Sequence, residues 1–228
     1  MPNYKHLMHM TGESGILQFS QLDIPDPQSG YTLDDNARAL MISLQMENGY
    51  EYASCYHHYL RQAQCADGSW SNFFLGGNFA SYFNSEDSAG RAILACSLAA
   101  SGPWQDIAAS CADMLLKKLP AVLTFKSPRA IAYVLIALCK NEIPGLNNRR
   151  RTQIISQLLS NLVLLYERYH GPGWFWFEDV LAYCNGILPQ AMFAAYAFSG
   201  DKKHLKIAHD SLNFLNSILF KEGYLNII

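Results

Sequence analysis

Two stretches of this sequence repeat one phrase, first as Gly30-Tyr31-Thr32-Leu33-Asp34-Asp35-Asn36-Ala37-Arg38-Ala39-Leu40 and then as Ser85-Glu86-Asp87-Ser88-Ala89-Gly90-Arg91-Ala92-Ile93-Leu94. Each copy sets two adjacent acids and a small polar residue before an Arg-Ala-aliphatic run. A third, partial copy lacks the acids and reads Ser127-Pro128-Arg129-Ala130-Ile131-Ala132. Small polar residues and acids favour the first turn of a helix, because they satisfy its free N–H groups and its positive dipole end. The recurrence therefore predicts a repeated helical unit.

The rest of the chain also has a helical pattern. Alternating Val, Ile and Thr are nearly absent, and long apolar stretches between Gly, Pro, Asn and Asp predict helices over 34–47, 51–64, 87–101, 104–118, 128–140, 148–169, 186–199 and 202–219. Short connections make consecutive helices antiparallel pairs. The first helix of each pair is the more apolar, which predicts an inner and an outer layer. We expect an all-α array or toroid of helical hairpins, with a period near fifty residues.

Composition limits the class of protein. The chain has 228 residues, half of them apolar, and a net charge of −2. The only basic run is Arg149-Arg150-Arg151, so we expect no nucleic-acid partner. No apolar stretch is long enough to cross a bilayer, and six widely spaced cysteines are typical of free thiols in a reducing compartment. We therefore expect one domain over residues 1–228 in the cytoplasm, with no membrane contact.

Candidate polar residues gather before the predicted inner helices. The acids in these segments include Asp34, Asp35, Glu86, Asp87 and Glu178. Such acids can cap helices, and one member of each adjacent pair is expected to do so. An acid left over beside Arg38 or Arg91 could instead exchange protons or bind sugar hydroxyls. The histidines show no ligand spacing, so the sequence predicts no metal and no cofactor.

Aromatic residues occupy the same loops. The stretch 171–179 holds four aromatic residues and two acids, and Trp70 precedes another aromatic group. Rings beside carboxylates and amides are typical of a carbohydrate cleft, where rings cover C–H faces and polar groups bind hydroxyls. Equally, any one ring can fill the core. The expected substrate-binding residues are Tyr31, Asn36, Arg38, Trp70, Arg91, Trp174, Trp176, Tyr183 and Asn185.

The sequence also resembles a known family. Its opening repeat, together with Asn72-Phe73, Ser85-Glu86-Asp87-Ser88, Ser127-Pro128-Arg129-Ala130 and Trp176-Phe177-Glu178-Asp179, is similar to bacterial α/α-toroid domains of the six-hairpin glycosidase-like type. Such domains are often associated with glycosyltransferases. The resemblance implies a toroid and a role in carbohydrate metabolism. About four of six hairpins fall within this chain, and its end is apolar (Leu225-Asn226-Ile227-Ile228), so we expect a truncated toroid or one completed by a partner.

Three functions remain open from the sequence. The first is a glycoside hydrolase of the inverting type, which needs two carboxyl groups about 6.5–9.5 Å apart. Those would come from different hairpins, as Asp34 or Asp35 with Glu86, Asp87 or Glu178. The second is a non-catalytic glycan-binding or scaffold domain that serves a glycosyltransferase, in which the acids are held by helix N–H groups and arginines. The third is a toroid that handles prenyl or terpenoid substrates.

Overall fold

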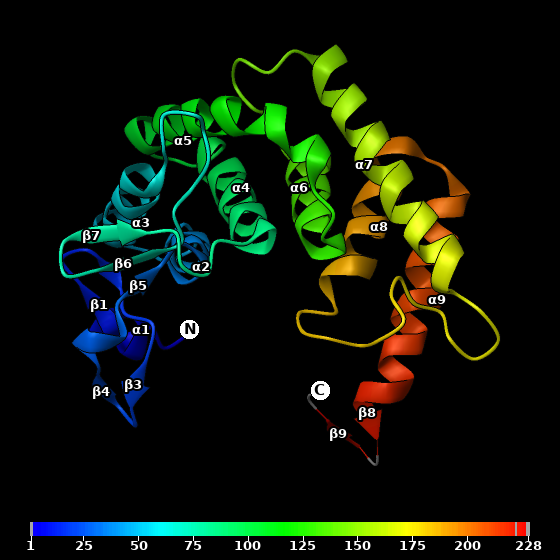
Figure 1. Cartoon of the computed structure of the whole chain (residues 1–228), viewed down its shortest axis with the longest axis horizontal. Helices are drawn as coiled ribbons and strands as arrows, with labels where there is room; N and C mark the ends of the chain where they lie inside the picture. Colours follow the sequence, from blue (N-terminus) through cyan, green and yellow to red (C-terminus); the bar gives the residue numbers. More distant parts are fainter. Residues whose placement is uncertain (1, 222, 227–228) are drawn as a thin grey trace. The chain divides into compact units, whose positions relative to one another are not determined.

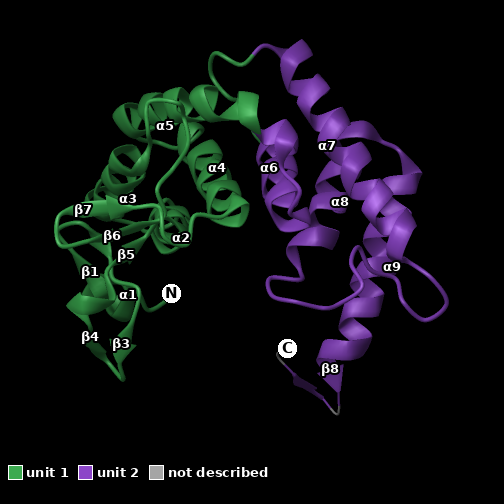
Figure 2. Cartoon of the chain, viewed as in Figure 1, with its two compact units in different colours: residues 1–121, 141–146 green, residues 122–140, 147–228 purple. Residues whose placement is uncertain are grey.

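The computed structural model describes residues 2–221 and 223–226, and its described part is mostly α-helical. The chain divides into two compact units, residues 1–121 with 141–146 and residues 122–140 with 147–228 (Figure 2). Ile227 and Ile228, part of the apolar end that suggested truncation, lie outside the described residues.

Unit 1 is built on four helices (Figure 1). Helix α2 (Leu33–Ser43) contacts both α3 (Tyr50–Ala63) and α4 (Glu86–Ala100), and α4 pairs with α5 (Gln105–Lys118). Nearly every residue of α4 is buried, whereas α3 and α5 each keep an exposed face. Helices that are apolar all round belong in the interior. Leu33, Leu40 and Ile93 are fully buried, so the core of unit 1 lies along α2 and α4.

Short strands and one short helix lie beside the N-terminal end of α2. Helix α1 (Lys5–Met10) leads into a hairpin of β1 (Thr11–Gly12) and β2 (Gly15–Ile16), and β3 (Ser20–Gln21) pairs with β4 (Ile24–Pro25). A 3-10 turn, η1 (Pro27–Ser29), precedes β5 (Tyr31–Thr32). A three-stranded sheet joins β5, β6 (Phe73–Leu75) and β7 (Asn78–Ala80), with Thr32 opposite Phe73. The sheet therefore ties the entry of α2 to the loop that leads towards α4.

Unit 2 contains the remaining helical hairpins. After the 3-10 segment η2 (Leu119–Thr124) come α6 (Pro128–Lys140), α7 (Asn148–Tyr169), α8 (Ile187–Ser199) and α9 (Lys202–Leu219), then a hairpin of β8 (Phe220–Lys221) and β9 (Tyr224–Leu225). Helix α6 contacts α7 and α8, and α8 contacts α9. Helices α6 and α8 carry the buried apolar surface, while α7 and α9 are amphipathic.

The helix predictions are confirmed. Helices α6, α7 and α9 have the predicted bounds, and α5 and α8 begin one residue later than predicted. Helices α3 and α4 begin and end one residue earlier, while α2 begins one residue early and ends four residues early at Ser43. All four predicted pairs are in contact, with the more apolar helix first. Helix α1 and the short strands were not predicted. Whether the two units form one toroid domain over residues 1–228 stays a prediction.

The capping residues show how the three copies of the repeat align with one another in their helices. Thr32, Ser85 and Ser127 each precede their helix and accept a hydrogen bond from the backbone N–H three residues on. Arg38 and Arg91 are thus the sixth residues of α2 and α4, whereas Arg129 is the second residue of α6. The third copy is therefore out of register with the other two. Its helix begins at Pro128, a residue type favoured at the first helical position, and its arginine follows at once. Arg129 occupies the position that Asp34 and Asp87 hold.

Candidate functional site

The entry of α2 forms a reciprocal cap. The backbone N–H of Asp35 donates to Thr32 Oγ1 at 3.1 Å, and that hydroxyl donates to Asp35 Oδ2 at 2.6 Å. This arrangement resembles a capping box, with a hydroxyl at the cap and an acid three residues later. It fixes one carboxylate oxygen of Asp35 and leaves the other without a bond from the cap.

The neighbouring carboxylate is held by two arginines. Asp34 Oδ1 accepts from Arg91 Nη1 at 2.6 Å, and Oδ2 lies 3.1 Å from Arg38 Nη2. The Arg91 side chain is buried, whereas the Arg38 side chain is 49 % exposed. Because Arg91 belongs to α4, the Asp34–Arg91 pair ties the starts of the two inner helices of unit 1 together.

The loop before α2 is anchored by Asn36. Its Oδ1 accepts from the backbone N–H of Ile16 at 3.0 Å, and its Nδ2 donates to the carbonyl of Thr32 at 2.8 Å. Gly15 has φ +130°, and a Cβ there would lie 2.2 Å from Asn36 Oδ1. Only glycine permits this approach of the loop to the buried amide. Asn36 therefore positions the loop that precedes α2 and is itself enclosed.

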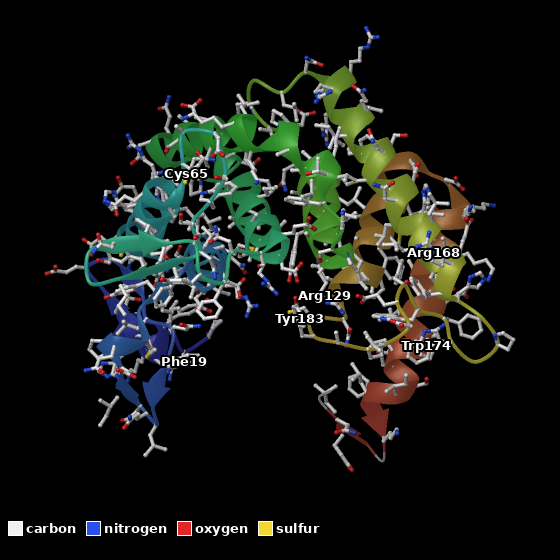
Figure 3. All side chains as sticks on the ribbon, in the orientation of Figure 1. Phe19, Cys65, Arg129, Arg168, Trp174 and Tyr183 are labelled. Atoms are coloured by element: carbon white, nitrogen blue, oxygen red, sulfur yellow. The ribbon has the colours of Figure 1, made fainter. Side chains whose placement is uncertain are left out.

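A cavity of about 510 Å³ opens beside this anchored loop. We call it the α2 cavity. Its polar wall holds Asp35, Arg38, His6 and Gln18, and its apolar wall includes Ile16, Leu17, Ala39 and Ile42. Phe19, which is 61 % exposed and is labelled in Figure 3, also lines the cavity. A concave, mixed surface with a few fixed polar groups is what small-ligand sites share.

Asp35 is electrostatically unusual. Burial raises the pKa of its carboxyl group above the ordinary value, and nearby Asp34 adds to the rise, while Thr32, Arg38 and Arg91 oppose it. A carboxyl group that holds its proton more tightly can donate it, either to a ligand oxygen or to a leaving group.

The raised pKa predicts a pH-dependent stability. Because the folded state holds the Asp35 proton more tightly than the unfolded state, this group favours folding at low pH and that contribution is lost as pH rises from about 3.8 to the raised value. We expect Asp35→Asn to be more stable than the wild type at neutral pH and equally stable in acid. Urea unfolding across pH 3–7 checks this. A variant whose stability follows the wild type at every pH would contradict it.

Unit 2 holds a second polar cluster, around Arg129. This guanidinium is buried and lies against both carboxylate oxygens of Glu178, with Nη1 at 3.0 Å from Oε1 and 2.8 Å from Oε2; only the first contact has hydrogen-bond geometry. Its Nη2 donates to Asn185 Oδ1 at 3.2 Å, and its Nε donates to the carbonyl of Tyr183. Arg129 therefore organises the segment before α8.

Tyr183 lies over this cluster. Its ring centroid is 4.9 Å from Arg129 Cζ, and Figure 3 shows the two side by side. Tyr183 is 55 % exposed. Asn185 is held on its other side, where Nδ2 donates to the carbonyl of Ala182 at 3.0 Å. The structure thus brings together Glu178, Tyr183 and Asn185, three of the predicted residues, through an arginine that was singled out only as part of the repeat.

The predicted tryptophans have different roles. Trp70 is buried and its indole N–H donates to the carbonyl of Leu60 at 2.9 Å. Trp176 is fully buried, and Trp174 is partly exposed with its indole N–H on the carbonyl of Glu178 at 2.8 Å. Trp70 and Trp176 are core residues, so Trp174 is the one predicted tryptophan with exposed surface.

The remaining predicted residues lie near helix starts of unit 1. Asp87 is buried and Glu86 half-buried in the first turn of α4, beneath the Ser85 cap. Tyr31 on β5 is half-buried, and burial raises the pKa of its phenol. Tyr31 packs against Phe74, with ring centroids 6.1 Å apart. None of these three lines the α2 cavity.

Several residues of the α2 cavity were not predicted. His6, Gln18 and Phe19 come from the N-terminal segment, which has no helix pattern and no repeat. A signal existed in the run Gly15-Ile16-Leu17-Gln18, where a glycine next to apolar residues indicates a close backbone approach. Only the structure shows that this approach is to Asn36.

Further features of this chain concern metal ligands, membrane spans and similarity to known proteins. Within the described ranges, no three His, Cys, Asp or Glu side chains gather closely enough to hold a metal ion. No helix among those described is long and apolar enough to cross a bilayer. Comparison with models of known protein families finds no match, and curated proteins show no significant similarity to this chain.

Proposed function

We propose that this chain is a glycan-binding domain of the glycosidase-like α/α-toroid type, and that it binds an oligosaccharide in the α2 cavity. The observation that carries the proposal is the position of Asp35, half-buried in the wall of a cavity that Arg38 and the exposed side chain of Phe19 also line. A carboxyl group and a guanidinium bind sugar hydroxyls, and an aromatic ring covers the apolar face of a sugar.

Binding is favoured over hydrolysis by the partners of two other acids, Asp34 and Glu178. Asp34 is engaged by Arg38 and Arg91, and Glu178 by Arg129. Carboxylates held this way organise helix starts, which is the arrangement expected of a scaffold or binding domain. The paired helices with an apolar inner member support the toroid. Its completion by a glycosyltransferase or by a second copy of the chain is part of the proposal.

A glycoside hydrolase is the second candidate, and one observation favours it. The raised pKa of Asp35 is the property that a general acid requires to protonate a glycosidic oxygen. In that case the wild-type protein releases reducing ends from an oligosaccharide, and Asp35→Asn does not. If the wild-type protein releases reducing ends no faster than a buffer blank does, the hydrolase candidate is excluded and only the binding function stands.

The proposal is tested by calorimetry with mannotriose, maltotriose and cellotriose. We expect at least one of these sugars to bind, and Asp35→Ala to weaken its binding about tenfold or more, because a charge-assisted hydrogen bond contributes roughly 1.5–3 kcal/mol. Asp23→Ala is the matched control, since Asp23 is an exposed acid of unit 1 outside the cavity. Equal weakening by both variants, or binding by neither the wild type nor the variants, would contradict the proposal.

A further inference from the structure

A second concave surface lies on the outer helices of unit 2. Cavities of about 300 Å³ and 380 Å³ adjoin here, because both are lined by Phe175 and Asp210. We call the pair the α7–α9 groove. It lies between α7, α9 and the loop that joins α7 to α8, and none of the residues predicted from the sequence lines it. Together the two cavities have the size of a small-molecule site, about 300–1,000 Å³.

The groove is lined by aromatic rings. Tyr166 is 5 % exposed, and His170 stacks on it with ring centroids 4.8 Å apart and planes at 10°. Phe175 is 39 % exposed on the loop. Its neighbours Trp174 and Trp176 both pack against Phe214, another residue of the groove. The loop is therefore anchored through its tryptophans, which presents Phe175 as a fixed open ring.

One polar group of the groove is unsatisfied. The hydroxyl of Tyr166 is buried and has no hydrogen-bond partner among the described residues. Buried polar groups in proteins nearly always have a partner, which can be an ordered water or a ligand. Burial also raises the pKa of this phenol to about 12, so the hydroxyl keeps its proton and can donate it.

The charges at the groove are balanced. Lys203 lies 2.6 Å from Glu167, and Lys206 lies 2.6 Å from Asp210. Two cations and two anions in pairs give no net attraction for a phosphate or for a charged peptide. They do offer donors and acceptors side by side, which match the hydroxyl groups of a neutral polyol.

We propose that the α7–α9 groove is a second carbohydrate site, which takes one or two neutral hexose units. The C–H face of the sugar packs on Phe175, its hydroxyls bond to Asp210 and Lys206, and the Tyr166 hydroxyl is satisfied from the groove side. This site is independent of the α2 cavity, since it rests on residues of unit 2 alone.

The test is a titration of ¹⁵N-labelled protein with mannotriose, maltotriose and cellotriose, followed by NMR. We expect at least one sugar to shift amide signals of residues 166–175 and 206–217. Phe175→Ala should weaken that binding about tenfold, since the ring supplies the apolar surface on which the C–H face of the sugar packs. Phe198→Ala, a ring of unit 2 with 37 % exposure outside the groove, should bind like the wild type.

Two further variants separate this site from the proposed function. Tyr166→Phe should fold normally, because it removes an unpaired hydroxyl, and should weaken groove binding several-fold. Asp35→Ala should leave groove binding unchanged, whether or not the α2 cavity binds sugar. Binding that survives both Phe175→Ala and Tyr166→Phe, or the absence of any shift in these residues with all three sugars, would overturn the inference.

Discussion

Replacing Arg129 by alanine is expected to destabilise the protein by about 3–5 kcal/mol, because it breaks a buried ion pair. Arg129 is buried, and its removal leaves the Glu178 carboxylate without its counter-ion and Asn185 Oδ1 without its donor. The segment before α8 also loses the bond from Arg129 to the carbonyl of Tyr183. Urea unfolding followed by circular dichroism measures the loss.

Arg168→Ala is the control for this change. Arg168 is an exposed arginine of α7 in the same unit, and we expect its removal to alter stability by less than about 0.5 kcal/mol. The double variant Arg129→Met with Glu178→Gln should recover part of the loss, because neither residue then leaves a buried charge. Equal losses for Arg129→Ala and Arg168→Ala would contradict the role given to this cluster.

Trp176→Ala is expected to cost about 3–5 kcal/mol, because it removes a fully buried ring and leaves a cavity. Trp176 packs against Phe177 and Phe214, with ring centroids 5.6 Å and 6.1 Å away. Trp176→Phe should cost less, since it keeps an aromatic ring and removes an indole N–H that has no partner among the described residues. Thermal and urea unfolding compare the two.

Phe175→Ala provides the comparison within the same loop. Its ring is 39 % exposed, so we expect a loss well under half of that for Trp176→Ala. The pair distinguishes a core tryptophan from a ring available to ligands. If Phe175→Ala were the more destabilising of the two, the assignment of Trp176 to the core would be wrong.

Most helices were predictable because local signals mark their ends; among the predicted helices α2 is the exception, since it stops at Ser43, four residues before its predicted end. Thr32, Ser85 and Asn147 are caps that the sequence displays, and each accepts the expected bond from its helix. The strands were not predictable, because most are two residues long and owe their pairing to turns rather than to alternating side chains.

Only part of the candidate site was predictable in its residues, and its contacts were not. The sequence singled out Asp34, Asp35, Arg38 and Arg91, and the structure brings these four to the entry of α2. That Arg91 crosses from α4 to Asp34 depends on tertiary packing, which spacing along the chain does not encode. Asp34 forms ion pairs and Asp35 lines a cavity, because the two adjacent side chains leave the start of α2 in different directions.

Arg129 shows how a repeat can mislead. Aligning its Arg-Ala-aliphatic run with those of Arg38 and Arg91 suggests a shared role. The caps place it four residues earlier in its helix, where it meets Glu178 and Asn185 instead of a preceding aspartate. Aligning the capping residues Thr32 and Ser127 would have revealed this, because a cap fixes helix register more directly than apolar residues do.

The most direct test of glycan binding at Asp35 is a crystal structure of the protein with the oligosaccharide that binds it most tightly. The account predicts a sugar ring in the α2 cavity, with its hydroxyls within hydrogen-bond distance of Asp35 and Arg38 and its apolar face towards Phe19. A bound oligosaccharide elsewhere on the protein, with the α2 cavity free of sugar at saturating concentration, would contradict it.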